Sequence, residues 1–315
     1  MSTLLVLQSG AAQGLLWALL TLGVYITYRL LDFADLTVEG SFPLGAAVTA
    51  ILINQGMNPF AVLFIAFLVG SIAGLATGIL NTVCKIPPIL SGILTMIALY
   101  SINLRIMSGK ATITIQGDTV KTLVNNLLPL SNNLLSIIAG IIINLLIVIL
   151  LYVFFGTEIG CSIRATGHNP YMARALGVHT GHMTILGLMI SNGLVALSGS
   201  LVSQLDYGSA LVTMGQGSIV IGLASVIIGE VIFCHKDHSF AYKLTAVVFG
   251  AVIYRTIIAF ALRVNILEAT DLKLITAVVV SIALSLPVIK NSIAERKKRI
   301  ANNKNEAAAG GESRA

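Results

Sequence analysis

The sequence contains few charged residues. Only 10% of its 315 residues are Asp, Glu, Lys or Arg, whereas 56% are apolar, and the mean hydropathy is +0.93. Soluble domains carry roughly 25% charged residues. Because so little charge cannot solvate the surface of a globule of this length, the composition excludes a soluble protein and favours one whose outer surface faces lipid.

The sequence also lacks the motifs of enzymes and metal sites. It contains no G-x-x-x-x-G-K-[ST] loop for nucleotide phosphates, no H-E-x-x-H zinc motif and no G-x-S-x-G nucleophile motif. Cys84, Cys161 and Cys234 are far apart, without the spacing of metal ligands. We therefore expect no catalytic residue, no metal and no cofactor in this chain.

The net charge of +6 does not indicate a nucleic-acid partner. Lysine and arginine gather in short segments between apolar runs and in the C-terminal tail, instead of covering one face. Placing residues 156–182 in the cytoplasm gives 13 Lys and Arg on that side of the membrane and five on the other. By the positive-inside rule this bias predicts a cytoplasmic C-terminus. We expect a membrane domain over residues 1–290 and a basic, disordered tail over 291–315.

Long apolar runs dominate the rest of the chain. A helix needs about 20 apolar residues to cross the hydrocarbon core. Spans are predicted at residues 11–31, 59–82, 88–108, 133–155, 183–205, 216–233, 239–262 and 272–290. The predicted fold class is an all-α polytopic membrane protein with about eight to ten transmembrane helices.

One further apolar stretch, Pro43–Ile53, is only about half a span long at ~1.5 Å per residue. It follows a polar segment that contains Asp35 and Glu39. Irregular backbone at membrane depth occurs where it is buried in protein or lines a cavity. The pattern predicts a broken or re-entrant helix near residues 32–54, with Ser41 as N-cap and Pro43 in the first turn.

Polar residues at this break have two possible roles. Acids at membrane depth are functional hypotheses by default, so Asp35, Thr37 and Glu39 could line the mouth of a path. The same side chains could instead pair with Arg29 and hold the broken helix in place. Both interpretations stay open at the level of sequence.

Three glycines, a glycine-rich segment and one arginine stand out within the predicted spans. Gly70, Gly74 and Gly78 are spaced by four, which predicts a helix-packing face. The glycine-rich segment 208–222 suits either close packing or a helix break. Arg255, in the middle of a span, must face protein or water, and we expect an acidic partner for it.

A short helix is predicted between two spans, within residues 156–182. Asn169 is a good N-cap, Pro170 a good first helical residue and Gly177 a good C′ residue. A helix of about two turns is too short to be stable alone in water. It therefore has to dock on something through the apolar side chains that it carries.

This loop resembles a known element. The run Arg164-Ala-x-Gly167-x-Asn169-Pro170-x-x-Ala173-x-x-x-Gly177 looks like the cytoplasmic coupling loop of ABC permeases of the branched-chain amino acid and ribose type. Residues 14–46 and 214–230 are also similar to that family, and the resemblance covers about residues 11–290. The run from Asp35 to Ser41 resembles the narrower group of tryptophan- or tyrosine-type permeases.

The resemblance implies the function and its partners. The chain would be the permease subunit of a bacterial plasma-membrane ABC importer for a small solute of the amino acid class, aromatic ones included. Its partners would be a second permease copy, two ATP-binding subunits that hold ATP and Mg, an extracytoplasmic binding lipoprotein and membrane lipid.

Two groups of candidate site residues follow. The residues expected to couple to the ATPase are Arg164, Gly167, Asn169, Pro170, Ala173, Arg174 and Gly177. Those expected along the translocation path are Asp35, Thr37, Glu39, Ser41, Gly215 and Gly217.

Other classes of membrane protein compete with this interpretation. A stand-alone secondary transporter would need ion-coupling acids near the membrane centre, whereas the acids here fall near predicted membrane edges. A non-transporting scaffold would not need a coupling-type loop.

Overall fold

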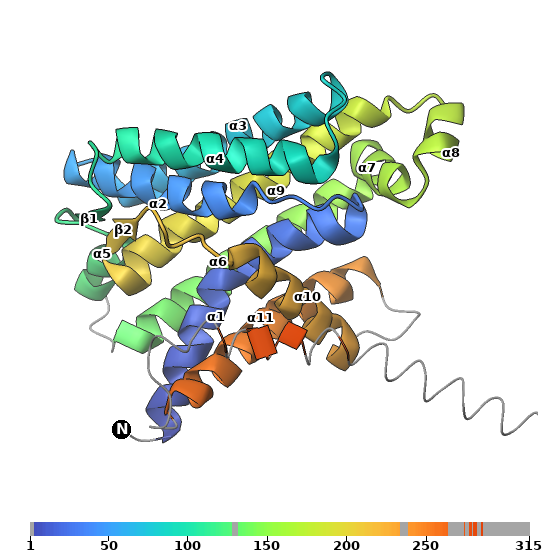
Figure 1. Ribbon diagram of the computed structural model, residues 1–315. Coiled ribbons are helices and arrows are strands. Elements are labelled where there is room, and N and C mark those ends of the chain that lie inside the picture. Colours follow the sequence, from blue (N-terminus) through green and yellow to red (C-terminus); the bar gives the residue numbers. More distant parts are fainter. Residues whose placement is uncertain are drawn as a thin grey trace, which may run out of the picture.

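The computed structural model describes residues 3–127, 132–233 and 239–263, with isolated positions between 274 and 285. These residues form one bundle of helices with a small two-stranded sheet at one end (Figure 1). Six of the described helices are long and apolar enough to cross a membrane. The predicted all-α, polytopic fold is confirmed, while most of the predicted span 272–290 and the whole tail 291–315 lie outside the described residues.

The elements are, in chain order, α1 (Thr3–Tyr25), the π-helix η1 (Ile26–Leu30), α2 (Val38–Asn54), α3 (Pro59–Thr82), α4 (Pro88–Ile106), β1 (Thr112–Thr114), α5 (Val120–Leu127), α6 (Asn132–Gly156), α7 (Glu158–His168), α8 (Pro170–Ala175), α9 (Thr180–Val202), the π-helix η2 (Ser203–Tyr207), β2 (Ser209–Leu211), α10 (Ser218–Phe233) and α11 (Phe240–Arg263). Strands β1 and β2 are antiparallel, and Thr112 lies opposite Leu211.

The bundle has two distinct ends. Helices α7 and α8 lie at one end, called the α8 end, and the β1–β2 sheet with α5 lies at the other, called the sheet end (Figure 1). Helix α1 runs from the sheet end toward the α8 end, where Gly167 of α7 packs on the backbone of Leu30. Helix α9 runs in the opposite direction and leads into β2.

The chain leaves helical conformation twice within the bundle. Residues 31–37 separate η1 from α2, and residues 208–217 separate η2 from α10. The helices that follow have only 17 and 16 residues, which at ~1.5 Å per residue is short of a ~30 Å hydrocarbon core. The predicted broken helix near 32–54 is therefore confirmed, and the predicted span 216–233 is a second short helix.

The predicted start of the first short helix is wrong. Helix α2 begins at Val38, so Pro43 lies in its second turn, and Thr37, not Ser41, is the residue before it. A proline removes only one intrahelical hydrogen bond, the one to the carbonyl four residues earlier. That carbonyl belongs to Glu39, and Gly215 packs directly against it.

The two breaks divide the bundle into two series of elements with opposite orientation. Each series has a long helix that ends in a π-helix, an irregular segment, a short helix and a helix of 24 residues: α1, α2 and α3 in the first, and α9, α10 and α11 in the second. Helix α3 packs on α9, and α11 packs on α1 in the corresponding way. Inverted repeats with discontinuous helices at their interface are typical of transporters.

Glycines bring these helices into backbone contact. A Cβ atom on Gly70 or Gly74 of α3 would collide with the α9 carbonyls of Asn192 or Leu188. Gly78 continues the same face of α3. The predicted packing role of the three glycines is confirmed, because such close approach between helices is what small residues permit.

We predict that Gly74→Ala destabilises the bundle, because the new methyl group would meet the Leu188 carbonyl. Overpacking of this kind costs about 1–3 kcal/mol. Thermal unfolding in detergent measures the effect, with Gly156→Ala as control, since a Cβ there meets open space. Equal unfolding temperatures for the two variants would contradict the prediction.

Candidate functional site

Buried side chains around the first break form one hydrogen-bonded network. Asp35 is only 1% exposed, and its carboxylate accepts the N–H of Thr37 at 2.9 Å and Nδ2 of Asn192 at 2.7 Å. The hydroxyl groups of Thr37 and Thr77 lie 2.7 Å apart, and that of Ser41 donates to Asn192 Oδ1 at 2.7 Å. Because buried polar groups are costly unless hydrogen-bonded, this network fixes residues 31–37 on α3 and α9.

Arg29 does not pair with the acids at the break, so the predicted Arg29 contact is wrong, whereas Asp35 does hold the break in place. Its guanidinium forms a bidentate ion pair with Glu230, with Nε at 2.8 Å from Oε1 and the terminal nitrogen at 2.6 Å from Oε2. The pair joins η1 to α10 at the α8 end. Because the two residues are 201 positions apart, no pattern in the sequence indicates that they are in contact.

The starts of the two short helices meet in the middle of the bundle. The N–H of Gly217 donates to Oε1 of Glu39 at 3.0 Å. Gly217 has a φ of +78°, which glycine adopts readily and other residues rarely do. Together with Gly215 against the Glu39 carbonyl, this contact brings three of the predicted path residues together.

Two cavities flank the turn that precedes α10. The first has a volume of about 830 Å³ and is lined by Gln216 and Gly217 of the turn and by residues of α1, α10 and α11. The second, of about 510 Å³, is lined by Glu39, Pro43 and again Gln216. A small solute in either cavity would lie beside a helix break, where backbone polar groups are available.

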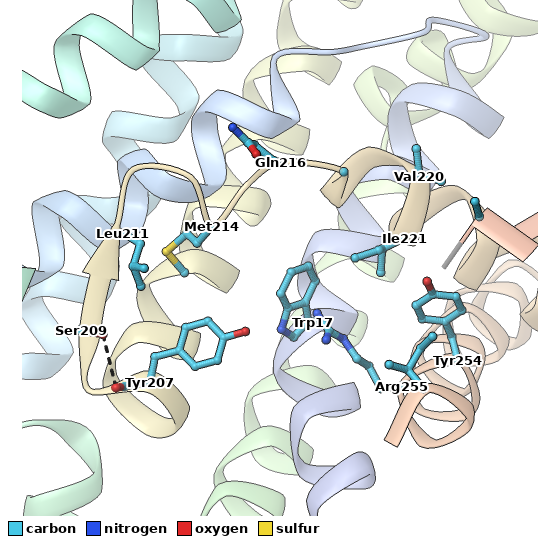
Figure 2. A pocket seen from close by; sticks show the side chains of 13 residues that line it. Trp17, Tyr207, Ser209, Leu211, Met214, Gln216, Val220, Ile221, Tyr254 and Arg255 are labelled. Atoms are coloured by element: carbon cyan, nitrogen blue, oxygen red, sulfur yellow. Dashed lines mark hydrogen bonds between the residues drawn. The ribbon is translucent and has the colours of Figure 1, made fainter. Parts of the chain in front are cut away.

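Aromatic side chains and one arginine line the first cavity (Figure 2). The sequence singled out Arg255 and led us to expect an acidic partner; Asp206 acts on it electrostatically but forms no ion pair with it, and the guanidinium carbon of Arg255 lies 3.6 Å from the ring centroid of Trp17. Trp17 was not identified from the sequence, although it is the single tryptophan of the chain. Tyr207 and Tyr254, also not identified, are further lining residues.

The short helix α8 has the predicted caps. Oδ1 of Asn169 accepts the N–H groups of Tyr171 at 3.1 Å and Met172 at 3.0 Å, and Pro170 is the first helical residue. Gly177 has a φ of +84° and closes the last turn with the hydrogen bonds of a Schellman motif. The N-cap, first-turn and C′ predictions are confirmed.

Helix α8 exposes most of its apolar side chains. Tyr171 is 80% exposed, Met172 62% and Leu176 73%. Ala173 is only 2% exposed, so it packs inward and does not face a docking partner. The outward face of α8 is therefore apolar and uncovered by the described part of the chain.

The remaining residues of the loop connect it to the helix ends. Arg174 donates from Nε to the Thr180 hydroxyl at 2.8 Å, at the start of α9. The guanidinium of Arg164 lies 5.3 Å from the ring centroid of Phe240 in α11. Because Gly167 also packs on η1, helix α7, which the sequence did not predict, connects the loop to α6, α9, α11 and η1.

Comparison with known proteins identifies the family. The profile described as "Branched-chain amino acid transport system / permease component" matches residues 6–286. A tyrosine transport system permease protein of Clostridioides difficile is 43% identical over 85% of this chain and 86% of its own length. An uncharacterized protein of Rickettsia prowazekii is 35% identical over 89% and 97%.

A fructose import permease protein of Bifidobacterium longum is 30% identical over 73% of this chain and 68% of its own. No solved structure matches the chain significantly. The residues matched by the family include both breaks, the helices that line the two cavities and the loop that contains α8. The chain therefore belongs to the branched-chain amino acid permease family of ABC transport systems, as a membrane component that is not itself an enzyme.

Proposed function

We propose that this permease forms the translocation path for an amino acid, imported at the expense of ATP hydrolysis in a partner subunit. The proposal rests mainly on helix α8. It is a short, capped helix whose outward apolar face is exposed, as expected of an element that docks on a second protein. The substrate class is supported by the family description and by the tyrosine transport relative. The runs Asp35–Ser41 and Arg164–Gly177 add the resemblance found in the sequence.

The docking role of α8 follows from its exposed apolar face. A six-residue helix has too few internal hydrogen bonds to be stable by itself, and its caps and Ala173 hold it on the permease. Burying Tyr171, Met172 and Leu176 against a partner would stabilise a complex by about 1.5–3 kcal/mol for each side chain. An ATPase subunit with a matching groove is the partner that an ABC permease requires.

A mechanical route connects α8 to the path. Helix α7 joins α8 directly, and its Gly167 lies against the backbone of Leu30 and Leu31, where the first break begins. Asp35, within that break, and Glu39, in the first turn of α2, hold the start of this helix. A displacement of α8 would therefore reach the segment next to both cavities through a few backbone contacts.

The proposed assembly is a homodimer of this chain with two ATP-binding subunits, which hold ATP and Mg, and an extracytoplasmic binding lipoprotein. The α8 end lies in the cytoplasm, as the Lys and Arg distribution favours. Exposed apolar residues on the outer helices, such as Phe64, Ile142 and Val153, suit contact with lipid or with the second copy.

The structure shows what Asp35 does in the bundle, where it is buried among α2, α3 and α9. Its carboxylate already accepts hydrogen bonds from Thr37 and Asn192, which gives it a structural role. The exposed face of α8 and the family membership favour the ATP-driven mechanism.

We predict that Met172→Asp weakens binding of the ATPase by at least about tenfold, because it would bury an unpaired charge in the docking interface. Uptake into cells and recovery of the ATPase on a tagged permease measure the effect. Val83→Asp, an exposed residue at the same end of the bundle, is the matched control. Normal uptake and recovery with Met172→Asp would show that α8 is not the coupling element.

A second prediction concerns orientation. Cys84 and Cys161 are exposed near the α8 end, so an impermeant maleimide should label them only after spheroplasts are permeabilised. A cysteine introduced at Gln55, in the exposed turn at the opposite end, should be labelled in intact spheroplasts of a variant that lacks the native cysteines. The reverse pattern would place α8 outside the cell and exclude contact with a cytoplasmic ATPase.

A further inference from the structure

We infer that the larger cavity binds the carboxylate group of the transported solute, with Arg255 as the cation and the aromatic and aliphatic side chains as the wall for the rest of the molecule. This inference rests on the proposed function in one respect, that the bound solute is also the one transported. It is carried by a buried guanidinium that has no ion-paired carboxylate, by unpaired donors beside it and by the composition of the cavity.

Arg255 has no ion-paired carboxylate in the described part of the chain, and the acid that acts on it electrostatically, Asp206, lies beyond salt-bridge distance. The salt bridge found there joins Arg29 to Glu230, and Nε of Arg255 is buried without a hydrogen-bond partner. Its guanidinium stacks on the Trp17 ring at 3.6 Å from the centroid, and Tyr207 and Tyr254 also lie near it. A cation–π contact orients a guanidinium but does not form an ion pair, so an anion that enters the cavity would pair with the guanidinium directly.

Further features of the cavity favour an anion. Nε1 of Trp17 is buried without a hydrogen-bond partner, and Trp17 lines the same cavity as Arg255. Helix α10 begins at this wall, with Gly217 and Val220 among the lining residues, and a helix N-terminus carries partial positive charge. The lining residues include no aspartate or glutamate.

The rest of the lining indicates what the carboxylate is attached to. Trp17, Tyr207 and Tyr254 contribute aromatic rings, and Leu211 and Met214 contribute aliphatic surface (Figure 2). A volume of about 830 Å³ falls within the range of about 300–1,000 Å³ for small-molecule sites. The chemical class is a monocarboxylate with an aromatic or large aliphatic group, amino acids among them, whereas an amine without a carboxylate would not bind.

The single tryptophan provides a direct measurement. Because Trp17 is the one tryptophan of the chain and stacks on Arg255, its fluorescence in the purified full-length permease reports occupation of this cavity. Three probes separate the chemistry: L-phenylalanine, 3-phenylpropionate, which lacks the amine, and phenethylamine, which lacks the carboxylate. We expect a saturable change with both carboxylates and none with phenethylamine.

Variants of the arginine test its role. Arg255→Gln should weaken binding of both carboxylates at least about tenfold, as expected for loss of a charge-assisted hydrogen bond, and Arg255→Lys should lose less. Arg105→Gln, at an exposed arginine near the end of α4, should bind like the parent. Because Arg255 acts electrostatically on the partly buried Asp206, gel filtration of each variant checks that it still folds.

The outcomes separate this inference from the proposed function. Unchanged affinity in Arg255→Gln, equal binding of phenethylamine, or no saturable change with either carboxylate would each overturn the carboxylate site, even if the assembled transporter imports an amino acid. Conversely, absence of ATP-driven uptake by the parent permease with its ATPase and lipoprotein would overturn the proposed function. The fluorescence measurement would still decide the carboxylate site.

Discussion

The hydrogen bonds of Asp35 allow the chain to turn back inside an apolar bundle. A segment that leaves a helix away from water must find partners for its polar groups, because an unsatisfied group costs several kcal/mol in such surroundings. The Asp35 carboxylate accepts one hydrogen bond from the N–H of Thr37, directly before α2, and another from the side-chain amide of Asn192 in α9. The position of α2, the contact of Glu39 with Gly217 and the cavities beside them all depend on this arrangement.

Local signals in the sequence predicted some features well. The caps of α8 require only residues within one turn of the helix ends, so Asn169, Pro170 and Gly177 could be interpreted without knowledge of the fold. The break near Asp35 was predictable because an acidic segment next to a half-length apolar run contradicts a continuous span. The packing face of α3 was predictable because three glycines at a spacing of four have few other uses in a membrane helix.

Features that depend on tertiary contacts were not predictable in the same way. The start of α2 was misplaced because Pro43 and Ser41 form a good local start signal, and only Asn192 and Gly215 from distant segments explain why the helix begins earlier. Helix α7 has a polar composition that gave no span-like pattern. The pairing of Arg29 with Glu230 and the stacking of Arg255 on Trp17 join residues far apart in the chain, so composition and spacing carried no information about them.

Backbone contact at glycines has a mechanical consequence for the whole subunit. Gly14 of α1 packs against α11, Gly23 of α1 and Gly45 of α2 pack against α9, and Gly250 of α11 packs against α10. Helices held this closely cannot slide along one another without collision, since packed interiors have little compressibility. The described bundle therefore has few internal degrees of freedom. Large displacements during a transport cycle would move it as a rigid body against its neighbours.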